Sequence, residues 1–159
     1  MAATPEDTLI IETSRGPVTV ELRPDLAPGH VARIKELVKD GFYDGIVFHR
    51  VIDGFMAQTG CPDGTGMGGS GKKLKAEFNK EPHVRGTVSM ARAANPDSGD
   101  SQFFICFDDA RFLDNQYTAW GKVIEGMDNV DKIKKGADPD GMVENPDRII
   151  KMQVAADAK

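Results

Sequence analysis

Two short stretches of the sequence place isolated polar side chains among apolar ones. Residues 48–58 read F-H-R-V-I-D-G-F-M-A-Q, so one cation, Arg50, and one amide, Gln58, lie among Phe48, Phe55 and Met56. Residues 101–107 (S-Q-F-F-I-C-F) form an apolar strand pattern that Gln102 interrupts. A guanidinium is always charged and donates several hydrogen bonds, so it can bind a polar group of a ligand held on an apolar surface. These residues predict a shallow apolar pocket with one fixed positive charge at its rim.

The same residues also have ordinary structural interpretations. Arg50, taken alone, is typical of a surface arginine that lays its stem on apolar residues and keeps its charge in water. Met56 can fill a gap in a core, and Gln58 can be a solvated amide. A strand places Met56 and Gln58 on one face, where the Gln58 amide can orient the Arg50 guanidinium. The pattern leaves both interpretations open.

The strand predicted at 102–107 is apolar on both faces. Alternation puts Gln102, Phe104 and Cys106 on one face, and the opposite face carries Phe103, Ile105 and Phe107. Phe104 either packs beneath the glycine-rich connection at 59–85 or lines an exposed apolar site. Gln102, at the head of the same face, favours the exposed site.

The remaining motifs predict no cofactor and no metal. Residues 66–71 (G-M-G-G-S-G) match the spacing G-x-G-x-x-G, but the sustained helix that a dinucleotide site requires does not follow. The histidines at positions 30, 49 and 83 have no metal-ligand spacing, and the cysteines at 61 and 106 do not complete one. Residues 138–141 read as a turn and lack the later ligands of a calcium loop. Neither cysteine lies in a motif typical of a nucleophile.

Composition and charge favour a single soluble domain in the cytoplasm. The formal net charge of the 159 residues is -5, and Lys and Arg are scattered, which argues against a nucleic-acid surface. The N-terminus lacks the basic start and apolar core of a secretory signal, and no apolar run is long enough to span a membrane. Two cysteines in a reducing cytosol usually stay reduced, with a disulfide between them as the alternative. We expect a monomer, because charges interrupt most candidate apolar patches.

Alternating and helical patterns divide the chain into short strands and two helices. Strands are predicted at 9–13, 17–22, 46–52, 55–58, 87–91, 102–107, 117–124 and 148–155. One helix begins at Pro28, which suits a first turn, and ends at Asp40 before Gly41. A second helix is predicted at 130–134. The domain is expected to span 8–155, with tails at 1–7 and 156–159.

About eight strands, two helices and turn signals between strands are typical of a mainly β fold. We predict a closed eight-stranded antiparallel β-barrel with two α-helices covering its ends. A barrel of this size has room inside only for side chains or for one small ligand. The candidates for the interior are bulky: Val18, Val20, Val47, Val51, Phe103, Ile105, Phe107 and Val123. The site is therefore predicted on the outside, which argues against a lipocalin-like carrier.

Five motifs resemble those of the cyclophilin family. They are F-H-R-V-I-x-G-F-M-x-Q (48–58), R-G-T-V-S-M-A-R (85–92), S-Q-F-F-I (101–105), F-L-D (112–114) and W-G-K-V-I-E-G-M-D-x-V-D-K-I (120–133). The resemblance runs in order from about residue 9 to residue 154. It implies a peptidyl-prolyl cis-trans isomerase built on an eight-stranded antiparallel barrel with two helices. Its partners would be proline-containing peptides and protein clients whose folding it assists.

The resemblance also assigns roles to single positions. It implies that Arg50 is the catalytic arginine and that Gln58 is its orienting amide. With the pattern above, it predicts substrate-binding residues at Phe48, His49, Phe55, Met56, Ala91, Arg92, Ala93, Gln102, Phe104, Phe112, Leu113 and Tyr117. Of these, the proline pocket would consist of Phe55, Met56, Phe104 and Leu113.

Three positions differ from the pattern of many family members. Tyr117 stands where many members have His, and Phe112 stands where cyclosporin-sensitive members often have Trp. Both departures predict weakened binding of cyclosporin. Arg92 stands where many members carry Asn, which predicts a bias toward acidic substrate segments. None of the three changes Arg50.

The sequence therefore gives two candidate functions. The first is an active prolyl isomerase, and the second is a proline-segment binding or chaperone module whose isomerase activity is incidental. The complete set of Arg50, Gln58 and Phe104 favours the first. The isomerase mechanism needs no acid, base, nucleophile or metal, which agrees with the motifs that are missing.

Overall fold

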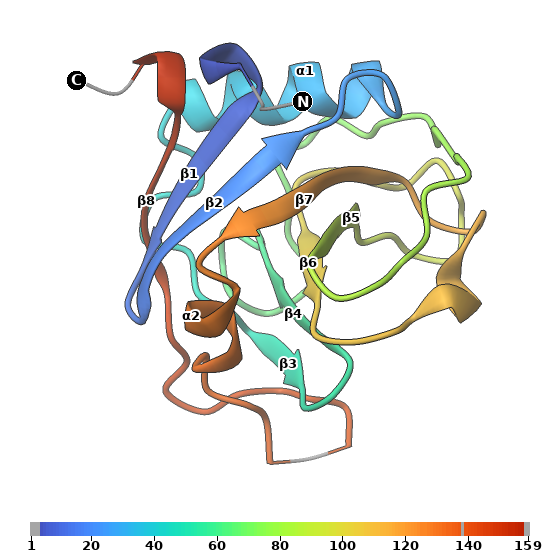
Figure 1. Cartoon of the computed structure of the whole chain (residues 1–159). Coiled ribbons are helices and arrows are strands. Elements are labelled where there is room, and N and C mark those ends of the chain that lie inside the picture. Colours follow the sequence, from blue (N-terminus) through green and yellow to red (C-terminus); the bar gives the residue numbers. More distant parts are fainter. Residues whose placement is uncertain (1–3, 138, 158–159) are drawn as a thin grey trace.

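The computed structural model describes residues 4–137 and 139–157, which form one curled antiparallel sheet with helices at its ends (Figure 1). The strands are β1 (Thr8–Thr13), β2 (Gly16–Leu22), β3 (Arg50–Ile52), β4 (Met56–Thr59), β5 (Thr87–Met90), β6 (Phe103–Cys106), β7 (Ala119–Glu125) and β8 (Ile149–Val154). Their order across the sheet is β3-β4-β6-β5-β7-β2-β1-β8. The helices are α1 (Pro28–Lys39) and α2 (Met127–Asp131), with short 3-10 turns η1 (Pro5–Asp7), η2 (Arg111–Leu113) and η3 (Ala155–Asp157).

The prediction of a closed barrel is wrong, because the end strands β3 and β8 form no ladder within the described residues. The strand expected at 46–52 is regular only from Arg50, and the chain before it pairs with the irregular segment 141–149. Phe48 N–H donates to the Asp147 carbonyl at 2.8 Å, and Val47 forms an isolated bridge with Arg148. Scattered backbone bonds thus cover the open side where a ladder would close a barrel. Val47, predicted to face the interior, is only half-buried.

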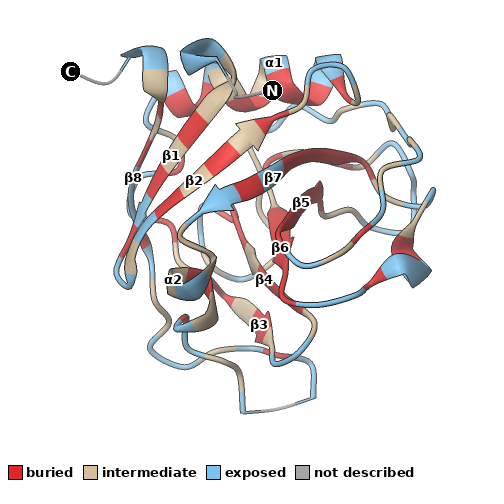
Figure 2. Ribbon diagram, in the orientation of Figure 1, coloured by how far each residue is buried: buried red, intermediate tan, exposed pale blue. Residues whose placement is uncertain are grey.

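The interior of the curled sheet is filled by side chains, as expected. Phe103, Ile105, Val18 and Val20 are buried there, with Trp120 packed edge-on against Phe103. Figure 2 shows that burial follows the strands and one side of α1. Three cavities formed by the described residues open on the surface and do not lie inside the sheet.

The helices follow the sequence with one shift. α1 begins at Pro28 and ends at Lys39, with Asp40 as the C-cap residue, as predicted. α2 begins and ends three residues before the predicted range of 130–134, because Gly126, with φ +85°, turns the chain directly into it. Figure 1 shows α1 across one end of the sheet and α2 beyond the end of β7, away from α1.

The chain ends carry more local structure than the expected tails suggest. Within the first seven residues, η1 forms and Lys35 Nζ lies 3.0 Å from Asp7 Oδ1. Residues 1–3, 158 and 159 of the expected tails, and residue 138 of the expected turn, lie outside the described residues.

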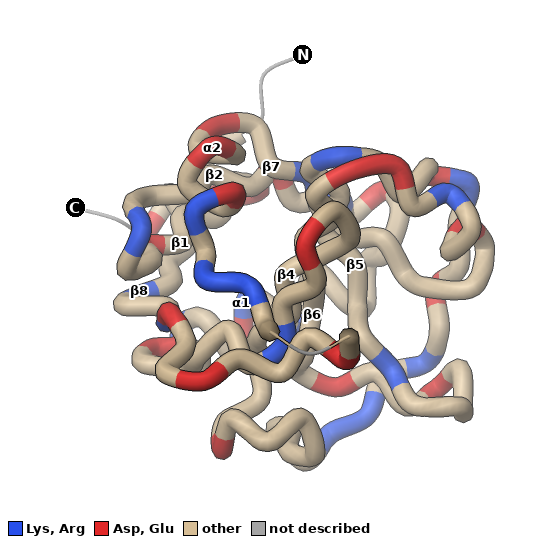
Figure 3. The backbone as a smooth tube through the Cα atoms, turned by 90° about the horizontal axis from the view of Figure 1, so that it is seen from below, with Lys and Arg blue, Asp and Glu red and all other residues tan. Residues whose placement is uncertain are grey.

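Figure 3 shows positive and negative residues distributed around the tube. In the described part of the chain, no helix is long and apolar enough to cross a membrane.

Candidate active site

The hairpin of β3 and β4 brings Arg50 and Gln58 together. The two residues are direct partners in the antiparallel register, so their side chains leave the sheet on the same face. Arg50 Nη1 donates to Gln58 Oε1 at 3.2 Å, and Arg50 Nε donates to the Asp140 carbonyl at 2.8 Å. A guanidinium held at two points has one orientation, which is not the behaviour of a freely solvated surface arginine.

A chain of amides determines which way Gln58 faces. Gln102 Nε2 donates to the carbonyls of Gly66 and Gly68 at 2.9 and 3.0 Å, so Gln102 Oε1 must point the other way. It accepts from Gln58 Nε2 at 2.9 Å, which in turn leaves Gln58 Oε1 facing Arg50. The glycine-rich connection therefore orients the arginine through two amides.

Cys61 anchors the other side of the same loop, a role that sequence reasoning missed. Its sulfur accepts the N–H groups of Gly66 and Gly68, each at 3.2 Å, and its thiol donates to Asp63 Oδ1 at 2.9 Å. Bonds from the Cys61 thiol and from Thr65 hold the pKa of Asp63 at about 2. Cys61 and Cys106 are both buried free thiols. Only the fold reveals this role, because two of the three bonds of Cys61 are made with backbone N–H groups.

An apolar cavity of about 200 Å³ opens beside Arg50. Its floor is Phe104, 5% exposed, which belongs with Met56 and Leu113 to a small apolar cluster separate from the main core. Phe104 thus lines a cavity that opens on the surface. The complete lining is Arg50, Phe55, Met56, Gln58, Ala91, Arg92, Phe104, Leu113 and Tyr117, all of them residues predicted for the site.

A second cavity of about 300 Å³ adjoins the first and shares Gln58, Ala91 and Arg92 with it. Ala93 and Gln102 of the predicted set line this second cavity. Its remaining walls come from the glycine-rich connection and from residues just before β6: Gly66, Met67, Gly68, Gly69, Lys73, Ser98 and Asp100. The two cavities are therefore neighbours that share part of their lining.

Three predicted substrate-binding residues line neither cavity. Phe48 is 1% exposed and belongs to the main core, because the chain at 48–49 is not yet a strand and does not continue the alternation that begins at Arg50. His49 is 2% exposed and lines neither cavity. Burial and then the charge of Arg50 lower its pKa. Phe112 is 66% exposed at the rim, where its ring centroid lies 5.5 Å from that of Phe55.

Arg92 forms the wall between the two cavities. Its Nε donates to the Gln116 carbonyl at 2.9 Å, and its Nη1 donates to the Ala93 carbonyl at 3.0 Å. The guanidinium carbon lies 4.7 Å from the centroid of the Tyr117 ring. These contacts fix Arg92 in place and bring its charge to both cavities.

The chain is similar to known proteins over nearly its whole length. A family model described as cyclophilin type peptidyl-prolyl cis-trans isomerase/CLD matches residues 8–154. A protein of Brucella suis named "Probable peptidyl-prolyl cis-trans isomerase" is 57% identical over 171 residues, covering 99% of this chain and 87% of its own.

Solved structures show the same fold. A cyclophilin from Hirschia baltica superposes with a TM-score of 0.90 at 31% identity, over 100% of this chain and 77% of its own. A Cryptosporidium parvum cyclophilin crystallised in the presence of the dipeptide Ala-Pro superposes with a TM-score of 0.85 at 28% identity, over 92% of this chain and 98% of its own. The chain therefore belongs to the family of cyclophilin-type peptidyl-prolyl cis-trans isomerases.

Proposed function

We propose that the cavity beside Arg50 holds the proline ring of a peptide while Arg50 stabilises the twisted bond that precedes it. The observation that carries the proposal is the orientation of the guanidinium by Gln58 and the Asp140 carbonyl at the edge of an apolar cavity. The Cryptosporidium parvum relative was crystallised in the presence of Ala-Pro, which supports a proline-containing peptide as ligand here.

The chemistry is rotation about an amide bond. The barrier is roughly 18–20 kcal/mol, because rotation breaks amide resonance. In the twisted transition state the proline nitrogen becomes pyramidal and regains a lone pair. An N–H of Arg50 can bond that lone pair only then, so the bond lowers the barrier without stabilising the planar ground state.

Arg50 and the cavity both contribute to the rate enhancement. A hydrogen bond to a charged group contributes about 1.5–3 kcal/mol, and about 1.36 kcal/mol is tenfold in rate, so Arg50 accounts for about ten- to a hundredfold. The planar amide is more polar than the twisted one, so an apolar cavity adds to the effect by disfavouring the ground state. Phe55, Met56, Phe104 and Leu113 supply that apolar surface and hold the ring.

A second candidate function is capture of proline-containing segments of unfolded chains, with isomerisation incidental. Two exposed apolar side chains favour it: Met67, 90% exposed on the glycine-rich connection, and Phe112, 66% exposed, each beside one of the two cavities. Both functions predict assistance to folding clients. They differ in whether Arg50 is needed.

Further properties follow as parts of the same proposal. The charge of Arg92 between the cavities favours acidic residues near the proline. Phe112 and Tyr117 weaken cyclosporin binding relative to members with Trp and His. We also propose a monomer that acts in the cytoplasm and binds neither nucleic acid nor membranes, on the evidence of the composition and the scattered charge.

NMR exchange on an Ala-Pro peptide tests the proposal. Catalytic amounts of the native protein should exchange the cis and trans signals rapidly, and Arg50→Ala should lose at least about tenfold, the value of one charged hydrogen bond. Arg15→Ala, which removes an arginine paired with Asp147 away from the site, is the control and should leave the rate unchanged. Native activity that survives Arg50→Ala would contradict the mechanism. Peptide binding without exchange would establish the capture function instead.

A further inference from the structure

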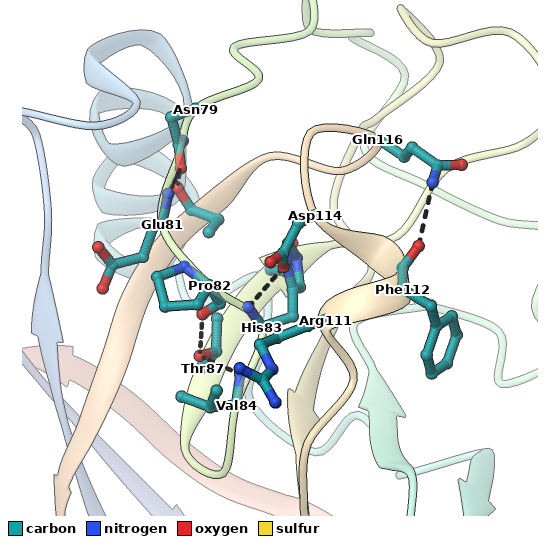
Figure 4. A network of polar contacts seen from close by, with 12 residues as sticks. Asn79, Glu81, Pro82, His83, Val84, Thr87, Arg111, Phe112, Asp114 and Gln116 are labelled. Atoms are coloured by element: carbon teal, nitrogen blue, oxygen red, sulfur yellow. Dashed lines mark hydrogen bonds and ion pairs between the residues drawn. The ribbon is translucent and has the colours of Figure 1, made fainter.

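A buried histidine, His83, lies beside Asp114 in the network of polar contacts drawn in Figure 4. His83 is 1% exposed; its Nδ1 lies 3.0 Å from Asp114 Oδ1 and its Nε2 lies 2.9 Å from Ser89 Oγ. The backbone N–H of His83 donates to the same Asp114 oxygen at 2.7 Å. A carboxylate only accepts, so Nδ1 carries the proton and Nε2 accepts from the Ser89 hydroxyl. The imidazole thus joins two segments that are distant in the sequence.

Both hydrogen-bonded partners are neighbours of cavity residues. Asp114 directly follows Leu113, and Ser89 in β5 is the direct register partner of Phe104 in β6. The imidazole ring itself stacks against Phe104, with centroids 6.2 Å apart and planes at 25°. The η2 turn is held from its other end too, because Ala110 N–H donates to the His83 carbonyl at 2.8 Å.

Tyr117, a third residue of the cavity lining, also contacts the imidazole of His83. The Tyr117 ring meets His83 edge-on with centroids 6.5 Å apart, and it meets Phe104 edge-on at 5.7 Å. The His83 side chain therefore contacts Phe104 and Tyr117 directly, and it holds Leu113 through the neighbouring Asp114. All three residues line the cavity. No other hydrogen-bonded histidine in the described residues has partners next to cavity residues, since His30 pairs with Glu77.

We propose that His83 is a positioning residue for the proline cavity, holding Leu113 and Tyr117 at a fixed separation from Phe104 through its bonds to Asp114 and Ser89. The proposal rests on the function assigned to the cavity above and names a residue outside its lining. His83 touches no substrate. It acts through Phe104, Leu113 and Tyr117, which line the cavity.

The protonation state of the imidazole agrees with this role. Burial lowers the pKa of His83, against the opposing pull of Asp114 and, at longer range, Glu81. The neutral ring has one donor and one acceptor, which match the carboxylate on one side and the hydroxyl on the other. Replacing it by a ring without nitrogens keeps the stacking but removes both tethers.

His30 offers a matched control that lines neither cavity. It is also 1% exposed, its Nδ1 lies 2.6 Å from Glu77 Oε1, and burial lowers its pKa. Neither His30 nor Glu77 lines the cavity. Instead, Glu77 accepts the N–H groups of Gly29 and His30 at the start of α1, where no side chain of the N-cap residue does so.

The test compares His83→Phe, Ser89→Ala and His30→Phe in steady-state isomerisation of an Ala-Pro peptide. The tethers of His83 serve to hold the proline ring, which is held in the ground state and in the transition state alike, and the variants leave the apolar lining itself in place. Loosening the walls therefore raises KM and leaves kcat nearly unchanged. We expect KM to rise about three- to tenfold in His83→Phe and in Ser89→Ala, with kcat within about twofold. His30→Phe should change neither constant. Imidazole 15N NMR of the native protein should show His83 protonated at Nδ1.

The outcomes separate the inference from the function on which it rests. An inactive native protein, or an active Arg50→Ala variant, would overturn the function. An active native protein whose KM is unchanged in His83→Phe, or is raised equally in His30→Phe, would overturn only the role of His83. Should His83→Phe fail to fold, Ser89→Ala decides alone, since it removes only the hydroxyl that bonds Nε2. A proton found on Nε2 would also contradict the assignment.

Discussion

Arg50 and Gln58 face each other across β3 and β4, and the Gln58 amide oxygen accepts a hydrogen bond from Arg50 Nη1 at 3.2 Å. This pair is one link of a longer chain in which Asp140 binds one edge of the guanidinium, and Gln102 and the glycine-rich connection orient the amide. The proposed active site is therefore a hydrogen-bonded chain that fixes one cation beside an apolar cavity. Each link can be removed separately.

Arg50→Lys should lose most of the activity even though it keeps the charge. A lysine ammonium lacks the planar fork of the guanidinium and cannot bond Gln58, the Asp140 carbonyl and a substrate nitrogen with one rigid group. We expect kcat to fall by about tenfold or more, the value of one charged hydrogen bond. Isomerisation rates from NMR exchange would measure this, with Arg15→Lys as the control. Full activity in Arg50→Lys would show that charge alone suffices.

Cys61→Ala should reduce activity, and Cys61→Ser should largely restore it. Alanine leaves the N–H groups of Gly66 and Gly68 without their acceptor, so the loop that holds Gln102 loosens. An unmet donor costs about 1–3 kcal/mol when it is buried, and these two are partly buried, so we expect part of that cost to appear as a severalfold lower kcat. A serine oxygen can still accept both N–H groups. Equal activity of the alanine and serine variants would show that the sulfur does not position the loop.

Gly60→Ala should destabilise the protein far more than Gly71→Ala. Both glycines have positive φ, +94° and +93°, so an alanine pays a similar backbone cost of about 1 kcal/mol at each. A Cβ at Gly71 would meet nothing within 4 Å, whereas a Cβ at Gly60 would collide with the Ser101 carbonyl oxygen and lie 2.9 Å from Gln102 Cα. Urea unfolding of both variants would measure the difference, expected to be at least about 2 kcal/mol from the overpacking. A smaller difference would mean that the backbone at 101–102 can shift.

Stability should fall as the pH is lowered from 7.5 to 5. Burial lowers the pKa of His30, His49 and His83 below the ordinary value of 6.5, so the unfolded chain binds more protons than the folded one in this range. The free energy of unfolding therefore rises with pH, and the stabilisation is lost as pH falls through the folded pKa values. Urea unfolding at constant ionic strength would measure the slope.

His49→Met provides the control for the pH dependence. His49 Nδ1 is buried without a hydrogen-bond partner in the described residues, and its side chain lines neither cavity. Removing this titrating group should flatten the slope of stability against pH while leaving kcat in place. An unchanged slope would mean that His49 is not a proton-linked group of the fold.

Much of the site was predictable because its signals are local. Alternation placed Phe103 and Phe104 on opposite faces of one strand, and the structure puts the first in the core and the second in the cavity. The short hairpin at 50–58 brings Arg50 opposite Gln58 by pairing of residues that are close in the sequence. Alternation failed at Phe48, because regular strand geometry begins only two residues later.

Only the tertiary structure decided the features that depend on backbone groups far away in the chain. The backbone carbonyl of Asp140 binds Arg50, and Cys61 holds its loop through the backbone N–H groups of that loop. No pattern of side chains in the sequence predicts either contact. The open edge between β3 and β8 depends in the same way on single bonds to the irregular segment 141–149. By itself, then, the sequence determined the strands, the first helix and the central residue pair, because side-chain periodicity and turn residues act over a few positions. The tertiary structure decided how the sheet ends and what holds the pair in place, because all residues except proline carry the same backbone N–H and C=O groups and only the fold selects which of them meet.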